Sequence, residues 1–490
     1  MRVVILSVVI FVLTSTAHAN VHWGTISNGK FYQVSPAPDG YVDQYPNDFT
    51  SGTKLTDEVR GASWPLDGWI GWLAKPVTIV LDLGSSYAVS DAHLGLASIR
   101  AWGVGFPTSV AISTSIDGAS WTPYGTSTVP SDPADQSWAT ATATASGWVN
   151  ARYVRFVIPA TSYLTFVDEI WVNGSVVDSA KHVPSTFYQG AFPVESHGWL
   201  DIGSFEADTA CPLDMVLWYA NWTTPFEGGN SDPGDLISRL IGGRFLEVGF
   251  LPEHATAAQI AQGQYDGFLR SWFAALGRRS VPVWVRPMNE MNGCWTGPLP
   301  YGSGSGPTAN CNASSPLHYG RDPANYRRAW RRMYNIAEQV GATGPDQIFV
   351  WAPGSSPDAG NPQDPNDPDR ISSYYPGPQY VDWVGVSAYS SDATSLDSLV
   401  QGIDSQYGND KPLMIAEGGN SDTTPSRRAA WIDGWFATLR GGRPHIKAAV
   451  WFSSTQPDPT TGAPNLSALR QANDPGKLAL SAYARGCRAH

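Results

Sequence analysis

Charged side chains, cysteines and long apolar runs are all scarce in this sequence. Asp, Glu, Lys and Arg make up 15% of the 490 residues, and the formal net charge is −12. A chain with this excess of negative charge is not expected to bind nucleic acid or an anionic membrane, because both attract basic surfaces. Neither a phosphate-binding G-x-x-x-x-G-K-[ST] loop nor a strand-linked G-x-G-x-x-G motif occurs. We therefore expect no nucleotide and no other cofactor for catalysis.

Only four cysteines are present, at positions 211, 294, 311 and 487. No C-x-x-C pair and no H-E-x-x-H motif occurs, which makes zinc ligation the weaker alternative. A small even number of cysteines is typical of exported proteins that form disulfides. The sequence therefore predicts two disulfide bonds.

One apolar run stands at the start of the chain. Residues 1–19 contain Arg2, an apolar run and the small-residue stretch Ala17-His18-Ala19. This order is typical of a secretory signal peptide and its cleavage site, and the run is short for a membrane-spanning helix. A membrane anchor is the alternative. We expect a secreted or periplasmic protein without membrane contact after cleavage.

Glycine, proline and aromatic residues are abundant. The chain has 49 Gly, 38 Pro, 21 Trp and 20 Tyr. Trp and Tyr rings combine an apolar face with a polar edge, so they suit flat polar ligands that stack on them. Without its first 19 residues the chain is still too long for one ordinary domain, and it suits two or three.

Residues 20–176 have the pattern of an antiparallel β-sandwich. Alternating apolar and polar runs follow one another between turn residues, and no amphipathic helix interrupts them. The clearest runs lie at 77–84, 109–118, 151–158 and 166–174.

This segment resembles a discoidin-like domain, the coagulation factor 5/8 type C fold also found in family 32 carbohydrate-binding modules. The resemblance rests on KLTDE (54–58), VLDLGSSYAVSDAHL (80–94), FPTSVAISTSIDGASW (106–121) and ARYVRFVIPA with DEIWVNG (151–174). It implies a jelly-roll sandwich and a structural calcium, for which Asp57 and Glu169 occupy matching places and offer oxygen ligands. Solvated loop acids are the alternative. Candidates for stacking on a sugar, with core packing as the alternative, are Trp64, Trp69, Trp72 and Trp102.

After a proline-containing linker at 177–185, short strands begin to alternate with helices. β-rich runs occur at 187–192, 214–221, 244–250, 281–287, 347–353, 380–389, 411–419 and 446–454. Between them, 258–277 and 324–341 are predicted as helices, the second from its clear helical spacing of apolar residues. This alternation predicts a (β/α)8 TIM barrel over 186–490.

The barrel implies a pairing of the cysteines. Cys211 precedes the second strand and Cys487 follows the last helix, so both are expected at the bottom of the barrel. Cys294 and Cys311 follow the fourth strand, at its top. The pairs 211–487 and 294–311 fit this arrangement, whereas other pairings would span the height of the barrel.

Two glutamates end strands of the predicted barrel. Glu290 lies past the fourth strand in WVRPMNEMNGCW (284–295), and Glu417 ends the seventh in PLMIAEGG (412–419). The C-terminal ends of barrel strands meet on one rim, where active sites lie. A glycosidase needs two carboxylates there, one to protonate the leaving oxygen and one to attack the anomeric carbon. A separation of about 5–5.5 Å predicts retention of configuration.

Aromatic residues at other strand ends predict a platform for the sugar. Trp222 follows the second strand, Tyr389 ends the sixth and Trp451 ends the eighth. Their flat rings can stack on pyranose faces. Core packing is the preferred interpretation for Trp218, Trp284 and Trp351.

The second segment resembles glycoside hydrolase family 26, in the clan of barrels with glutamates on strands four and seven. The resemblance covers most of 180–470, through YDGFLRSWFAALGRRSVPVWVRPMNEMNGCW (265–295), NYRRAWRRMY (325–334), QIFVWAPGS (347–355), YYPGPQYVDWVGVSAY (374–389), KPLMIAEGG (411–419) and AVWFSS (449–454). It implies that Glu290 is the general acid/base and Glu417 the nucleophile. It also implies sugar-binding roles for Tyr389, Trp451 and Trp295.

Two stretches depart from the family pattern. The family usually has His before the acid/base glutamate. Here that position is Asn289, and asparagine is the usual residue there in the wider clan, where its amide typically hydrogen-bonds the 2-hydroxyl of the sugar. WTGPLP at 295–300 replaces a more aromatic stretch. With Arg286, Asn289 is expected to contact the substrate. Because both departures lie where the sugar is recognised, they weaken the expectation of β-1,4-mannan, the common substrate of the family.

The sequence thus predicts a secreted, monomeric, retaining β-glycoside hydrolase that acts on a polysaccharide. An endo-β-1,4-mannanase-like activity is the first expectation, with xylan or β-1,3/β-1,4-glucan as alternative substrates. A transglycosylase would use the same covalent intermediate. The alternative from another class is a non-catalytic glycan-binding protein, against which the retention of both glutamates argues.

Overall fold

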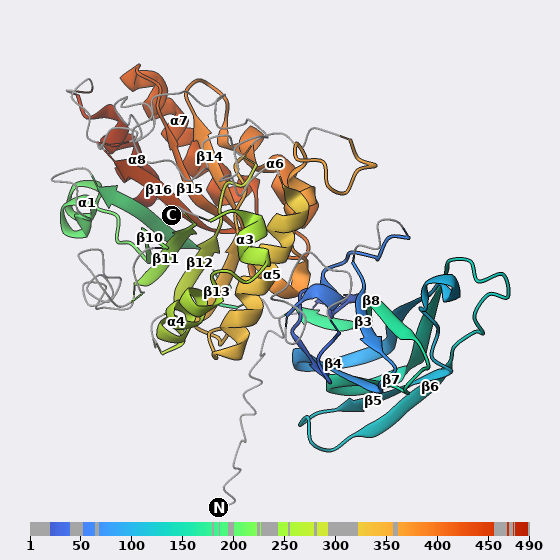
Figure 1. Cartoon of the computed structure of the whole chain (residues 1–490). Helices are drawn as coiled ribbons and strands as arrows, with labels where there is room; N and C mark the ends of the chain where they lie inside the picture. Colours follow the sequence, from blue (N-terminus) through green and yellow to red (C-terminus); the bar gives the residue numbers. More distant parts are fainter. Residues whose placement is uncertain are drawn as a thin grey trace, which may run out of the picture.

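A computed structural model of the chain describes residues 20–39, 52–63, 68–178, 181–185, 187–194, 200–222, 226, 244–252, 255–278, 282–292, 322–355, 361–454, 468–469, 474 and 476–488. They form two domains, a β-sandwich followed by a larger barrel ringed by helices (Figure 1). The predicted signal peptide at 1–19 lies outside the described residues. None of the described helices has the length and apolar character that a membrane crossing requires.

The N-terminal domain is built from antiparallel strands in the order β1-β8-β4-β7-β5-β6, with β2 added on β4 and β3 on β8. The strands are β1 (Asn20–Thr25), β2 (Tyr32–Ser35), β3 (Ile70–Leu73), β4 (Val77–Ser98), β5 (Ser109–Ser115), β6 (Thr122–Thr128), β7 (Ala139–Ile158) and β8 (Leu164–Asp178). In the first half of β4 every second side chain is buried in one apolar core, as the predicted alternation requires. The predicted antiparallel sandwich is confirmed.

The C-terminal domain is a closed barrel of eight parallel strands, which confirms the predicted TIM barrel. The strands are β9 (Tyr188–Val194), β10 (Met215–Asn221), β11 (Phe245–Leu251), β12 (Val283–Pro287), β13 (Gln347–Trp351), β14 (Trp383–Ser390), β15 (Leu413–Asn420) and β16 (Ile446–Ser454). Their side chains point alternately into the barrel and outward to the helices, and two separate apolar clusters fill these layers. This alternation decides which residues at the strand ends can reach the rim.

The helices around the barrel are α1 (Ile202–Thr209), α3 (Ala257–Ala261), α4 (Asp266–Gly277), α5 (Pro323–Gln339), α6 (Leu396–Tyr407), α7 (Pro425–Ala437) and α8 (Leu478–Arg488). The single helix predicted over 258–277 is in fact two, because the chain turns at Gly263 with φ +82°. A side chain at that position would also collide with the Arg332 guanidinium. The disulfide between Cys211 and Cys487, the latter in the last turn of α8, confirms the first predicted pair. Cys294 and Cys311 lie outside the described residues.

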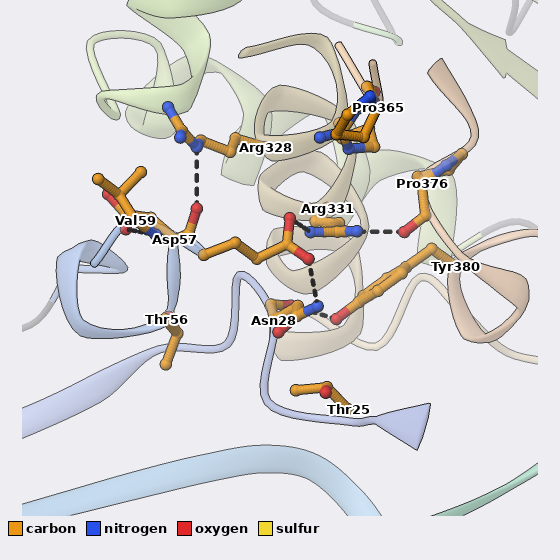
Figure 2. Close-up of polar contacts among 12 residues, drawn as sticks. Thr25, Asn28, Thr56, Asp57, Val59, Arg328, Arg331, Pro365, Pro376 and Tyr380 are labelled. Atoms are coloured by element: carbon orange, nitrogen blue, oxygen red, sulfur yellow. Dashed lines mark hydrogen bonds and ion pairs between the residues drawn. The ribbon is translucent and has the colours of Figure 1, made fainter. Parts of the chain in front are cut away.

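The sandwich docks on α5 through arginine side chains (Figure 2). Arg331 Nη1 lies 2.6 Å from Glu58 Oε2, and Arg331 Nε donates to the Pro376 carbonyl at 2.7 Å. One helical turn away, Arg328 Nε donates to the Asp57 carbonyl at 3.0 Å. The same guanidinium of Arg331 therefore ties together the sandwich, α5 and the segment before β14.

A second set of contacts joins the domains beside these arginines. Lys30 Nζ lies 3.0 Å from Glu338 Oε2 on α5, and the carbonyl of Gly29 accepts a hydrogen bond from Asn335. Gly29 has φ +68°, and a Cβ there would lie 2.9 Å from Arg331 Cβ. Only glycine allows the sandwich backbone to approach α5 this closely.

The docked sandwich lies where the barrel has little helix of its own. Among the described residues between β13 and β14, the helical elements are two short 3-10 turns, η3 (Ile371–Tyr374) and η4 (Pro378–Tyr380). Tyr380 at the end of η4 donates to the Asn28 carbonyl of the sandwich. The predicted linker is also anchored, since Lys181 Nζ lies 3.1 Å from Asp382 Oδ2 and donates to the Thr343 and Gln347 carbonyls.

Candidate active site

Glu290 stands on a tight turn that directly follows β12. Both Met288 and Glu290 have positive φ, +48° and +58°. A side-chain-bearing residue in this region costs about 1 kcal/mol or more, so neighbouring contacts must hold the turn. The Glu290 amide donates to the Ala352 carbonyl at 2.8 Å. Asn292 adds a reciprocal pair with Gly354, donating to its carbonyl at 3.0 Å and accepting from its amide at 2.8 Å.

Glu417 is buried within β15 and is surrounded by hydrogen-bond donors. Arg286 Nη1 lies 3.0 Å from its Oε1, and Ser387 Oγ approaches the same oxygen at 3.5 Å. The hydroxyls of Tyr219 and Tyr389 donate to Oε2, that of Tyr389 at 3.2 Å. Glu417 is therefore held in one orientation by donors on both of its oxygens.

Tyr219 links the two glutamates electrostatically. Burial raises the pKa of its hydroxyl well above the usual value, and the charges of Glu417 and Glu290 add to the rise. Both carboxylates therefore act on one phenol at the rim. Its ring needs the neighbouring Gly249, where a Cβ would lie 2.6 Å from the Tyr219 ring.

A second carboxylate lies behind Arg286. Glu247 Oε1 on β11 is 2.8 Å from Arg286 Nε, and both side chains are completely buried. Burial raises the pKa of Glu247 to about 8; Arg286 opposes this rise, and the charge of Glu417 adds to it. Arg286, predicted to bind substrate, instead lies beneath Glu417 with no exposed surface. Its inward strand position at the base of the rim explains this difference.

Two predicted stacking residues, Trp222 and Trp451, face the helices instead of the cleft. Trp222 is 7% exposed and stacks on Phe250, and Trp451 is fully buried with its ring 5.3 Å from Trp435. Both belong to the outer apolar layer. Both residues were predicted from their positions at strand ends, without regard to the alternation of side chains between the two faces of a strand. Stacking on a sugar needs an exposed ring face, and neither tryptophan has one.

Their sequence neighbours of opposite parity are the residues that the prediction missed. Tyr219 precedes Trp222 by three positions and points inward, and Phe452 follows Trp451 directly. The Phe452 ring stacks on Phe192 at 4.8 Å and lies 6.0 Å from Tyr389. The inward Met215, Leu217, Tyr219 series of β10 could not be recognised from the sequence, because the outward residues between them are apolar as well. Core packing, preferred for Trp284 and Trp351, is observed for both.

Of the remaining predicted site residues, two lie beside the glutamates and one lies outside the described residues. Asn289 is buried on the turn beside Glu290, and Tyr389 keeps 39% of its surface exposed. Both therefore lie at the rim, next to a carboxylate. Trp295 lies outside the described residues.

The aromatic candidates of the sandwich mostly belong to its core. Trp69 and Trp72 are fully buried, the first against Trp138 and the second with its indole N–H on the Pro36 carbonyl. Trp102 is 50% exposed at the end of η2 (Arg100–Trp102), so it remains a candidate for stacking. Trp64 lies outside the described residues.

Of the predicted calcium ligands, Glu169 is buried and Asp57 is partly exposed. Burial raises the pKa of Glu169 well above its usual range, and the charge of Asp57 raises it further. Glu169 Oε2 has no hydrogen-bond partner, whereas Asp57 Oδ2 lies 3.4 Å from Lys54 Nζ. An orphaned carboxylate oxygen beside a second carboxylate suits a hard cation. In the part of the chain that the structure describes, no group of three or more His, Cys, Asp or Glu gathers as a metal site.

One family model matches part of each domain. The family model described as F5/8 type C domain matches residues 43–170, and that described as Glycosyl hydrolase family 26 matches residues 264–438. The second match contains the Glu290 turn and β15 with Glu417. It does not include the first three strands of the barrel, β9 to β11, or the last strand, β16.

Curated relatives are similar at low identity. Endoglucanase H of Acetivibrio thermocellus is 24% identical over 260 residues, 51% of this chain but only 26% of the relative. Mannan endo-1,4-beta-mannosidase of Bacillus subtilis is 25% identical over 291 residues, 52% of this chain and 69% of the relative. The crystal structure of the GH26-CBM35 β-(1,4)-mannanase of Podospora anserina is 12% identical, covers 88% of this chain and 91% of that one, and has a TM-score of 0.36. The chain is thus similar to an F5/8 type C domain in its first part and to glycosyl hydrolase family 26 in its second, the two resemblances that the sequence predicted.

Proposed function

We propose that the protein is a retaining β-glycoside hydrolase with Glu417 as nucleophile and Glu290 as general acid/base. The observation that carries the proposal is the asymmetry of the two carboxylates. Glu417 is oriented by Arg286 and two tyrosine hydroxyls, as a nucleophile must be. Glu290 instead stands on the turn after β12, which its own positive φ and the bond of its amide to the Ala352 carbonyl hold in place, and there it can serve as proton donor.

The reaction proceeds in two steps. Glu417 attacks the anomeric carbon while Glu290 protonates the departing glycosidic oxygen, and a glycosyl-enzyme results. Glu290, now a carboxylate, deprotonates the water that releases the sugar, and the configuration is retained. Tyr389, partly exposed beside Glu417, is placed to contact the sugar at the cleavage point.

A β-1,4-mannan is the first substrate proposed, and xylan or β-1,3/β-1,4-glucan the second. A Bacillus subtilis relative named as a mannosidase favours mannan, whereas Endoglucanase H and a Beta-1,3-xylanase of Alcaligenes sp keep the alternatives open. Asn289 beside Glu290 supports the alternatives, because an amide there suits a 2-hydroxyl in the equatorial position of glucose or xylose. The axial 2-hydroxyl of mannose would approach from another direction.

A panel of polysaccharides tests the activity. We expect the purified chain to release reducing sugar from at least one of β-1,4-mannan, β-1,4-xylan, β-1,3-xylan and mixed-linkage glucan. Binding without release would favour the non-catalytic alternative. Products longer than the substrate would indicate a transglycosylase.

Azide rescue assigns the two roles. Glu290→Ala with sodium azide and a dinitrophenyl β-disaccharide should form the β-glycosyl azide, since azide then attacks the glycosyl-enzyme. Glu417→Ala should form the α-azide, because azide replaces the nucleophile directly. Each variant should lose at least about 1,000-fold in kcat without azide. An active Glu417→Ala enzyme would overturn the proposal.

The proposed context of this activity is extracellular, with the first 19 residues as signal peptide. The sandwich is proposed to bind a glycan, with Trp102 as a stacking ring, and to hold calcium at Asp57 and Glu169. Millimolar calcium should raise the melting temperature of the wild type, but not that of Glu169→Gln. Trp102→Ala should weaken retention on insoluble polysaccharide by about 1 kcal/mol.

A further inference from the structure

Arg286 has two carboxylate partners, and the proposed reaction uses only one of them. Glu417 Oε1 lies 3.0 Å from Nη1, and Glu247 Oε1 lies 2.8 Å from Nε. Glu247 and Arg286 have no exposed surface. Glu247 therefore contacts neither solvent nor substrate, and the mechanism so far gives it no role.

The position of Glu247 within the barrel is unusual for a carboxylate. On β11 the neighbours Leu246, Val248 and Phe250 face the helices, so Glu247 faces the barrel interior. Interior layers of such barrels are normally filled with branched apolar residues. An apolar side chain there would avoid the desolvation that a buried carboxylate suffers. Stabilisation of the fold by the Glu247–Arg286 pair alone therefore does not explain why a carboxylate occupies this position.

The proposed reaction supplies a better reason. Glu417 loses its negative charge when its oxygen becomes bonded to the anomeric carbon. Arg286 keeps its positive charge throughout, because a guanidinium does not lose its proton in proteins. In the glycosyl-enzyme, Glu247, whose Oε1 lies 2.8 Å from Arg286 Nε, still offers the buried guanidinium a carboxylate.

We propose that Glu247 is a positioning residue that keeps Arg286 paired and oriented while Glu417 is esterified, an inference that rests on the proposed function. In that step the bond between Glu417 and the anomeric carbon forms and the glycosidic C–O bond breaks. The leaving oxygen takes the proton of Glu290. Glu247 then balances the charge that Glu417 no longer balances, and Arg286 stays in place to receive the carboxylate again.

The electrostatics of the free enzyme agree with this role. Burial raises the pKa of Glu247 to about 8, Arg286 on β12 lowers it, and the charge of Glu417 on β15 raises it. Tyr219 on β10 completes the surrounding groups, and burial keeps its hydroxyl protonated. Loss of the Glu417 charge removes one raising influence, so Glu247 becomes a stronger acid in the glycosyl-enzyme. Above about pH 8, where Glu247 is already a carboxylate, no proton has to leave the buried site during this step.

Glu247→Gln separates this role from a structural one, because it keeps the shape but cannot carry charge. The substrates are dinitrophenyl β-mannobioside, β-xylobioside and β-cellobioside, whose leaving group needs no proton from Glu290. We expect kcat to fall about 10- to 100-fold, the effect of removing one charge partner from the guanidinium that holds the nucleophile. KM should change little. The ionisation near pH 8 should disappear from the kcat profile of the variant.

Asp382→Asn is the matched control, since it also removes a buried carboxylate that pairs with a cation, Lys181, at 3.1 Å. It should lower the melting temperature and leave kcat and its pH profile unchanged. Glu247→Gln with wild-type kcat and pH profile, and only a lower melting temperature, would overturn the inference. If Glu247→Gln does not fold, Glu247→Asp is judged by the same kcat criterion.

The wild type keeps this test apart from that of the proposed function. A wild type that releases no sugar from any polysaccharide and no dinitrophenol would end the proposed function, and this inference with it. An active wild type with an unaffected Glu247→Gln variant would end this inference alone.

Discussion

Two arginine clusters of this chain, one inside the barrel and one at the domain junction, use the same chemistry at different depths. The side chains of Arg286 and Glu247 have no exposed surface, and that of Glu417 has 5%. Arg331 pairs with Glu58, which is 38% exposed, and with a backbone carbonyl. Desolvation makes the first cluster costly in folding free energy, so we attribute its presence to the reaction. The second cluster is partly exposed and stabilises the domain contact at a smaller desolvation cost. Depth therefore separates a charge kept for chemistry from one kept for docking.

Arg286→Met should have the largest effect on both stability and activity. It leaves Glu247 and Glu417 facing each other in the interior without a cation, which is expected to cost about 3–5 kcal/mol of unfolding free energy. kcat should fall more than about 100-fold, because Glu417 loses its strongest donor. Urea unfolding and hydrolysis of a dinitrophenyl disaccharide measure the two. If Arg286→Met were as stable as the wild type, the two buried carboxylates would not depend on the arginine for their stability in the folded protein.

The dependence of stability on pH should reveal Glu247 next. Its pKa rises from the usual value near 4.5 to about 8 on folding. Between these values the folded protein holds a proton that the unfolded chain has lost, so this contribution to stability is complete below pH 4.5 and is lost as pH rises through 8. The wild type should therefore lose stability between pH 5 and pH 9 relative to Glu247→Gln. Parallel curves for the two proteins would show that Glu247 is already ionised at pH 5.

Arg331→Ala should have a smaller effect, confined to the junction. It removes the ion pair with Glu58 and the bond to the Pro376 carbonyl, at a cost of about 1–2 kcal/mol. Because Arg331 is one of the residues that tie the sandwich to α5 and to the η3–η4 segment, the two domains should then unfold in separate steps. Calorimetry should resolve two transitions in place of one, with kcat unchanged. A lowered kcat would mean that docking also shapes the active site.

The sequence predicted the barrel and its glutamates because both depend on patterns along one strand. Apolar strands that end in a polar residue, as in PLMIAEGG, report the rim position of Glu417 directly. Trp222 and Trp451 were misplaced because the side on which a strand-end residue points depends on the parity of the strand. Here the apolar residues on both sides of the strand hide that parity.

Other features depend on contacts between distant segments, and no local pattern contains them. Glu247 lies in FLEVGF, where one acid in an apolar strand indicates nothing until Arg286 from the next strand is placed beside it. The arginines in RRAWRR fit the solvated face of a helix equally well. Only the position of the sandwich, through Glu58 and Gly29, turns Arg331 into a docking residue.

Arg485→Ala should have the smallest effect and completes the series in depth. Its ion pair with Asp433, at 3.0 Å, has about half of each side chain exposed (55% and 51%). Water and salt screen such a pair, so its removal should change the unfolding free energy by less than about 0.5 kcal/mol, with kcat unchanged. The three arginine variants should thus rank by burial, although the Arg–carboxylate distances differ by no more than about 0.4 Å. A loss for Arg485→Ala as large as that for Arg331→Ala would show that the ion pair itself, and not its depth, sets the contribution.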